Sequence, residues 1–134
     1  MELTNSGIPI ICPDDKKATE TLALSIEAQI KDYDSEKSQE GSSNIVIIDL
    51  KNITDIEPIE PGFKRRLNAM AANSDKKIIL ITPSLRLRSR LIGLGLNEKI
   101  DLCGSLEQAE NEIAERLADI DELKRRMRRE YYSR

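Results

Sequence analysis

Apolar and polar positions follow two different periods along this chain. Two runs, Ile45–Leu50 and Lys77–Thr82, are apolar almost throughout, as is typical of strands that are covered on both faces of a parallel sheet. Between such runs, apolar residues recur every three or four positions, as they do on one face of a helix. With shorter strands at Ile8–Cys12 and Lys99–Cys103, the pattern predicts the order β-α-β-α-β-α-β-α.

A short hairpin is predicted at the start of the chain. Residues Glu2–Thr4 form its first strand, and the turn residues 5–7 lead into the strand at Ile8. Pro9 and Pro13 lack the backbone N–H that a sheet ladder requires, so the hairpin is expected at a sheet edge. The predicted fold is therefore α/β, with a mixed, mainly parallel sheet of four to five strands and about four helices.

The helices are predicted from their caps and their apolar stripes. Asp14 or Asp15 is expected to cap the first helix, Ser84 the third, and Gly93 or Gly95 to end the third. The polar stretch from residue 34 to 43 predicts a solvated loop. Inward positions are expected at Leu22, Ile26, Ile30 and Tyr33 in the first helix, at Phe63, Leu67 and Met70 or Ala71 in the second, and at Leu87, Leu91 and Leu94 in the third.

The last predicted helix is unusually long. Ser105 and Gln108 form a capping box at its start, in which the side chain of each residue accepts the backbone N–H of the other. An apolar heptad then continues beyond residue 118, where the domain is expected to end. We therefore predict a domain at residues 1–118 and a helical extension at residues 119–134 that mediates self-association, as in a homodimer, or docking to another protein. Its contact residues would be Ile120, Leu123, Met127 and Tyr131.

Composition argues against an enzyme. The chain has 39% apolar and 34% charged residues, a net charge of −3 and no histidine, which removes the usual general base and the commonest metal ligand. Cys12 and Cys103 are expected to be small buried apolar residues rather than zinc ligands. No cofactor or metal is predicted. Neither a transmembrane stretch nor a signal pattern is found, so a cytoplasmic location is expected.

Several blocks of the chain resemble the STAS domain, the fold of the anti-sigma factor antagonists. They are the strand that ends at Asp49-Leu50, Ile53, the acidic run Asp55-Ile56-Glu57, the third-helix region from Pro83-Ser84 to Gly95-Leu96, and Ser105-Leu106-Glu107-Gln108-Ala109. The resemblance covers about residues 5–118. It implies a bacterial regulator of transcription that binds a protein partner, such as an anti-sigma factor or a serine-kinase-type regulator.

The resemblance also implies a phosphorylatable serine at the start of the second helix, and this chain lacks it. An ungapped alignment places Glu57 and Pro58 at the family's Asp-Ser positions, whereas alignment on Gly62 places Glu60 at the serine. Glu60 either imitates phosphoserine, serves ordinary helix-start chemistry together with Pro61, or belongs to an acidic loop that the partner reads. In either register the usual phosphorylation switch is expected to be lost.

The partner surface is expected around this loop and helix start. Phe63 would anchor the helix inward, while Glu60, Lys64 and Arg65 face outward. The full predicted contact set is Glu57, Pro58, Ile59, Glu60, Pro61, Gly62, Phe63, Lys64 and Arg65.

Two alternatives come from other residues. Asp14, Asp15 and Asp49, with Thr82, resemble the acidic pocket of a response-regulator receiver, which would make the chain a degenerate phosphoacceptor or a nucleotide-binding domain; the lysine that such a site needs is absent from residues 102–105. The basic stretch at residues 124–129 suggests a second alternative, in which the chain binds nucleic acid. Basic residues also stabilise a helix C-terminus, which is the preferred interpretation.

Overall fold

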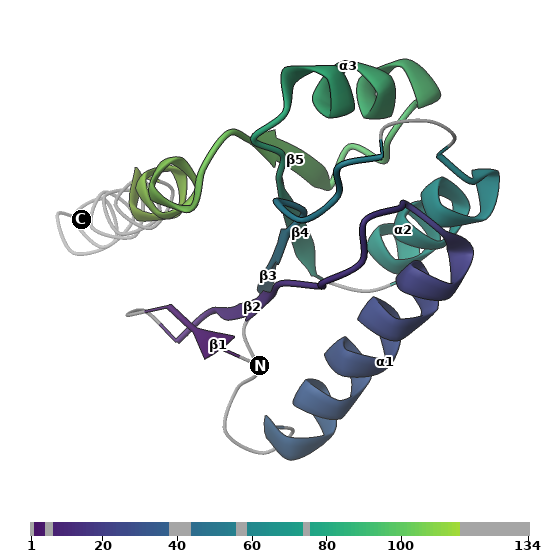
Figure 1. Cartoon of the computed structure of the whole chain (residues 1–134). Coiled ribbons are helices and arrows are strands. Elements are labelled where there is room, and N and C mark those ends of the chain that lie inside the picture. Colours follow the sequence, from purple (N-terminus) through teal and green to yellow (C-terminus); the bar gives the residue numbers. More distant parts are fainter. Residues whose placement is uncertain (1, 5–6, 38–43, 56–58, 74–75, 116–134) are drawn as a thin grey trace, which may run out of the picture.

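A computed structural model describes residues 2–4, 7–37, 44–55, 59–73 and 76–115 of the 134-residue chain (Figure 1). The predicted α/β order is confirmed in this part. The elements are β1 (Glu2–Leu3), β2 (Pro9–Ile11), α1 (Glu20–Lys37), β3 (Ile45–Asp49), α2 (Pro61–Asn73), β4 (Lys77–Ile81), α3 (Leu85–Leu94) and β5 (Ile100–Cys103). Residues 106–115 form the described part of a fourth helix.

The sheet is mixed and mainly parallel, as predicted. Its strand order is β1-β2-β3-β4-β5, so each strand lies beside its neighbour in the sequence. Strands β2 to β5 run parallel, and Ile47 of β3 lies between Ile10 of β2 and Ile79 of β4. The two-residue strand β1 pairs antiparallel with β2 and completes the expected edge hairpin. The carboxyl ends of four strands therefore share one edge of the sheet.

The helices cover both faces of the sheet, but unequally (Figure 1). Each crossover between parallel strands advances the sheet in the same direction, and right-handed crossovers of this kind place α1, α2 and α3 on the same face. Their core is built on Val46, Ile48 and Leu80. The fourth helix packs on the other face, where Ala109 and Ile113 join Ile47, Ile79 and Ile81. Alternate residues of β3 and β4 thus serve the two cores, which explains why both strands are apolar except for Asp49 and Lys77 at their ends.

Several helix ends follow the sequence signals and one does not. Ser84 Oγ accepts the Leu87 N–H at 3.2 Å, and Gly95 ends α3 with a φ of 83°. Helix α1, however, starts at Glu20 and is capped by Thr19, whose hydroxyl accepts the Leu22 N–H at 3.1 Å. The expected cap at Asp14 or Asp15 is therefore wrong, because those residues belong to a connection that runs along the sheet edge before the helix begins.

Other details also depart from the expectations. Helix α1 continues to Lys37, beyond the predicted start of the loop. Leu94 is 39% exposed rather than inward. Cys12 follows the last residue of β2 and is exposed, whereas Cys103 is buried as expected. Each departure occurs at the end of an element, where the apolar pattern gives the weakest boundary signal.

The predicted C-terminal extension lies outside the described residues, and with it Ile120, Leu123, Met127, Tyr131 and the basic stretch. Self-association or docking through that segment stays a prediction. Within the described ranges, none of the helices combines the length and the apolar character needed to cross a bilayer.

Candidate functional site

The predicted contact surface lies where the connections after β2 and β3 meet at the carboxyl edge of the sheet. Asn52 Nδ2 donates a 2.9 Å hydrogen bond to the Pro13 carbonyl. The backbone N–H of Asp55 donates to the Lys16 carbonyl at 3.0 Å, next to a bridge between Lys17 and Asp55. Residues 13–17 therefore brace the connection that leads to α2. Small ligands of open α/β folds commonly bind outside the carboxyl ends of the strands.

Glu60 links the starts of two helices. Its Oε1 accepts a 2.8 Å hydrogen bond from the backbone N–H of Glu20, the first residue of α1. Its own N–H donates to the Ala18 carbonyl at 3.0 Å, and its carbonyl accepts the Phe63 N–H at 3.0 Å. Since the first N–H groups of a helix have no partner inside the helix, the Glu60 carboxylate satisfies one that Thr19 leaves unpaired. Its negative charge also lies at the positive end of the α1 dipole.

The side chain of Glu20 in turn contacts α2. Arg66 Nε lies 3.6 Å from Glu20 Oε1, with both side chains about half exposed. An added Cβ at Gly62 would come within 2.8 Å of Glu20 Cβ and Cδ, so the Glu20 side chain lies directly against the first turn of α2. We call Ala18, Glu20, Glu60, Gly62 and Arg66 the helix-start junction. In this junction, Glu60, which precedes α2, caps α1, and Glu20, the first residue of α1, packs on α2.

The structure places most of the predicted contact residues, but not all on the surface. Glu57 and Pro58 lie outside the described residues. Phe63 is fully buried, as expected of an anchor, and Gly62 is buried beneath Glu20. The remaining five residues flank these two buried positions. Ile59 and Lys64 are partly buried, while Glu60, Pro61 and Arg65 are exposed.

The contact between Glu60 and Glu20 was not foreseen from the sequence. The acid before Pro61 does signal a helix start, but that signal concerns the helix that follows it. The helix actually capped lies 40 residues earlier in the chain. The carboxylate of Glu60 is therefore exposed and already hydrogen-bonded at the same time.

The acids of the receiver-like alternative are distributed along the same edge. Asp14 and Asp15 are exposed, and Asp49 Oδ1 accepts the backbone N–H of Lys51 at 3.0 Å in a local turn. Thr82 is buried, and its hydroxyl donates to the Cys103 carbonyl at 3.4 Å. In the part of the chain that the structure describes, no three His, Cys, Asp or Glu side chains are grouped so that they could hold a metal ion.

A second polar cluster lies at the end of β5. The Sγ of Cys103 is 3.3 Å from Glu112 Oε2 in the fourth helix. Burial, followed by the hydrogen bond and the negative charge of Glu112, raises the pKa of the Cys103 thiol from 9.0 to about 12. The thiol is therefore a neutral hydrogen-bond donor at physiological pH. It has the opposite character to a reactive cysteine, which needs a lowered pKa.

No family model matches the chain, and no curated protein or solved structure matches it either.

Proposed function

We propose that this chain is a cytoplasmic regulatory domain of the STAS type, which binds another protein through the turn and first helical turn at residues 59–65. The observation that carries the proposal is the Glu60–Glu20 hydrogen bond, because it fixes the start of α2 against α1 at the carboxyl edge of the sheet. A surface that is already ordered loses less conformational freedom when a partner binds. The resemblance of residues 45–62 and 83–109 to the STAS pattern supplies the class of partner.

The charges on this surface suggest how the partner would be recognised. Arg65 is exposed and Lys64 partly exposed on the first turn of α2, beside the exposed Pro61. Rim charges of this kind steer association and select partners more than they add affinity. A partner with an acidic patch and a groove for the Pro61 turn fits this arrangement.

Regulation by phosphorylation of the usual serine is not part of the proposal. The sequence from Asp55 to Arg66 contains no hydroxyl side chain. Phosphate acts at such a site by adding about −1.5 to −2 charges beside a helix start. Here the corresponding negative charge is the permanent carboxylate of Glu60, already hydrogen-bonded to α1. Partner affinity would therefore not be switched by phosphorylation at this position.

The experiment is to isolate the complex from native cells with the tagged full chain, identify the bound protein and measure the dissociation constant with the purified pair. The double charge reversal Lys64→Glu/Arg65→Glu is expected to weaken binding about tenfold or more, because it places like charges against the acidic patch of the partner. The matched control is Arg86→Glu/Arg90→Glu, which reverses two exposed basic residues of a different helix, α3.

Equal loss of affinity in both double variants, or no loss in the first, would contradict the assignment of residues 59–65 as the contact surface. Thermal unfolding of each variant distinguishes a surface effect from a folding defect.

A further inference from the structure

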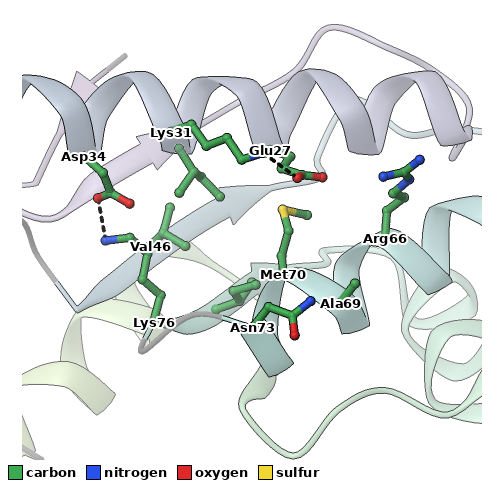
Figure 2. Close-up of a pocket in the computed structure, with 11 residues that line it drawn as sticks. Glu27, Lys31, Asp34, Val46, Arg66, Ala69, Met70, Asn73 and Lys76 are labelled. Atoms are coloured by element: carbon green, nitrogen blue, oxygen red, sulfur yellow. Dashed lines mark ion pairs between the residues drawn. The ribbon is translucent and has the colours of Figure 1, made fainter.

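A cavity lies between α1 and α2, and Arg66 of the helix-start junction lines one end of it. Its volume is about 270 Å³, far more than the ~30 Å³ share of one water molecule and just below the ~300–1,000 Å³ typical of ligand pockets. Figure 2 shows α1 along one side and α2 along the other, with the sheet behind. The space opens to solvent on one side, as a cleft that admits a ligand does.

The inner part of the cavity is apolar. Val46 of β3 and Ile78 of β4 form its floor, and Ile30 of α1 lines its wall. Met70 projects from α2 toward α1 across the middle of the opening (Figure 2). The flexible and polarisable side chain of methionine adjusts readily to an apolar occupant. These residues favour an aliphatic body in the ligand.

The charged residues of the lining are unequally paired. Lys31 lies 3.0 Å from Glu27 and Lys76 lies 2.9 Å from Asp34, so each acid of the lining has its own lysine. Arg66 is the fifth charged residue of the lining, which therefore has a net charge of +1. The acid nearest to Arg66 is Glu20, outside the lining, at a looser 3.6 Å.

Arg66 and Asn73 mark the length of the cavity along α2. They are seven positions apart in the helix, which corresponds to about 10 Å at a rise of 1.5 Å per residue. Within the lining the excess positive charge lies at the Arg66 end, and Glu20 just outside the lining partly offsets it. The planar guanidinium matches a second carboxylate with two parallel hydrogen bonds.

We propose that this cavity binds a small aliphatic acid, with the carboxylate on Arg66 and the hydrocarbon chain along Met70 toward Val46 and Ile78. This site is separate from the proposed partner surface, although Arg66 also belongs to the helix-start junction. The inference does not depend on the identity of the protein partner.

Octanoate is the probe, and the Met70 methyl group is the reporter. The full chain has three methionines, Met1, Met70 and Met127. It is labelled with ¹³C at the methionine methyl groups, and the Met70 signal is assigned by its absence in Met70→Leu. Octanoate is expected to shift the Met70 signal in a saturable manner with a dissociation constant at or below about 1 mM, at the weak end of the affinity scale. Octan-1-ol, which lacks the charge, is expected to bind at least tenfold more weakly.

Two variants test the two halves of the site. Arg66→Gln is expected to weaken octanoate binding about tenfold and to leave octan-1-ol binding unchanged, because a charge-assisted contact is lost. Its control is Arg86→Gln, at an exposed arginine of α3 outside the lining. Ala69→Leu adds volume at an exposed position of the lining and is expected to abolish binding of both compounds. Ala72→Leu, at an exposed position of the same helix outside the lining, is its control.

The proposal is overturned if the Met70 signal does not move up to 10 mM octanoate. It is also overturned if octanoate and octan-1-ol bind equally, or if either control weakens binding as much as its partner variant. A shift lost selectively in Arg66→Gln and Ala69→Leu, with unfolding temperatures close to that of the parent chain, supports it.

Discussion

The Glu60 carboxylate accepts a 2.8 Å hydrogen bond from the backbone N–H of Glu20, so the residue that precedes α2 caps the start of α1. The two residues are 40 positions apart in the chain. One side chain thereby joins the proposed contact surface to the body of the domain. In the proposed STAS resemblance, the same side chain occupies one of the two positions at which the family's serine would fall.

Replacement of Glu60 tests this capping role. Glu60→Ala is expected to lower the free energy of unfolding by about 1 kcal/mol, the usual effect of losing a side-chain acceptor at a helix start. Glu60→Gln keeps an acceptor oxygen and removes the charge, so its effect should be limited to the dipole contribution of about 0.3–1 kcal/mol. Urea unfolding followed by circular dichroism measures both.

The same two variants distinguish a structural role from imitation of phosphoserine. If the charge of Glu60 sets partner affinity, Glu60→Gln will change the dissociation constant while leaving stability nearly intact. If Glu60 acts through the cap alone, Glu60→Gln will bind like the parent chain. A stability of Glu60→Ala equal to that of the parent would show that the hydrogen bond to Glu20 has no energetic weight.

Gly62 and Gly93 should respond in opposite directions to alanine. A Cβ at Gly62 would lie 2.8 Å from Glu20 Cβ, whereas a Cβ at Gly93 would meet nothing within 4 Å. Gly62→Ala is therefore expected to destabilise the domain by about 1–3 kcal/mol, as overpacking does. Gly93→Ala lies in the last turn of α3 and should stabilise it by about 0.4–1 kcal/mol. Chemical denaturation compares the pair, and a stabilising Gly62→Ala would mean that α1 and α2 are less closely packed.

Replacing the two members of the ion pair between Lys76 and Asp34 should have unequal effects on the free energy of unfolding. Lys76 Nζ lies 2.9 Å from Asp34 Oδ1 and 5.7 Å from the centre of the Tyr33 ring; its side chain is 9% exposed, compared with 39% for Asp34. Asp34→Asn removes the carboxylate beside a largely buried ammonium and should cost about 1–2 kcal/mol, less than a fully buried pair would. Lys76→Met leaves an acid that can turn to solvent, so it should cost less.

A control for this comparison is the pair of Lys31 and Glu27, in which the lysine side chain is 73% exposed. Glu27→Gln should change stability by less than about 0.5 kcal/mol, as surface ion pairs do. Equal effects of Asp34→Asn and Glu27→Gln would contradict the asymmetry. Thermal and urea unfolding provide the measurements.

The two cysteines should differ in reactivity. Cys12 is exposed and Cys103 is buried. The pKa of Cys103 is raised to about 12 by burial, with smaller contributions from Glu112. At pH 8, iodoacetamide should therefore modify Cys12 in the folded chain and reach Cys103 only on unfolding, because the thiolate is the reactive form. Mass spectrometry of tryptic peptides would show the order, and early labelling of Cys103 would contradict it.

The raised pKa also predicts how stability depends on pH. The folded state holds the Cys103 proton more tightly than the unfolded state, whose thiol has a pKa of 9.0. The resulting stabilisation is fully present below pH 9 and is lost as pH rises toward about 12. Stability should fall more steeply in the parent chain than in Cys103→Ala in this window, by at most about 1.4 kcal/mol per pH unit. Parallel pH profiles of the parent chain and Cys103→Ala would show that burial does not shift the pKa of the thiol.

Local signals in the sequence determined the elements of this protein. Continuous apolar runs predicted β3 and β4 within one residue of their ends, because residues on both faces of these strands are buried. Ser84 was predicted as a cap because its hydroxyl reaches an N–H only three residues away. The start of the fourth helix shows the limit: Ser105 Oγ accepts the Gln108 N–H at 3.2 Å as predicted, but Gln108 Oε1 accepts the N–H of Gly104 rather than that of Ser105.

The tertiary structure alone decided which distant groups meet. Glu60 caps α1 because the connections after β2 and β3 lie side by side, and no local pattern around residue 60 specifies residue 20. The cavity arises in the same manner, since its lining comes from two helices and two strands. Hydrophobic periodicity records how much of each residue is buried, whereas hydrogen bonds between connections depend on the packing of whole elements. The sequence by itself therefore determined the α/β order and the apolar cores, while the packed fold decided the helix-start junction and the space beside it.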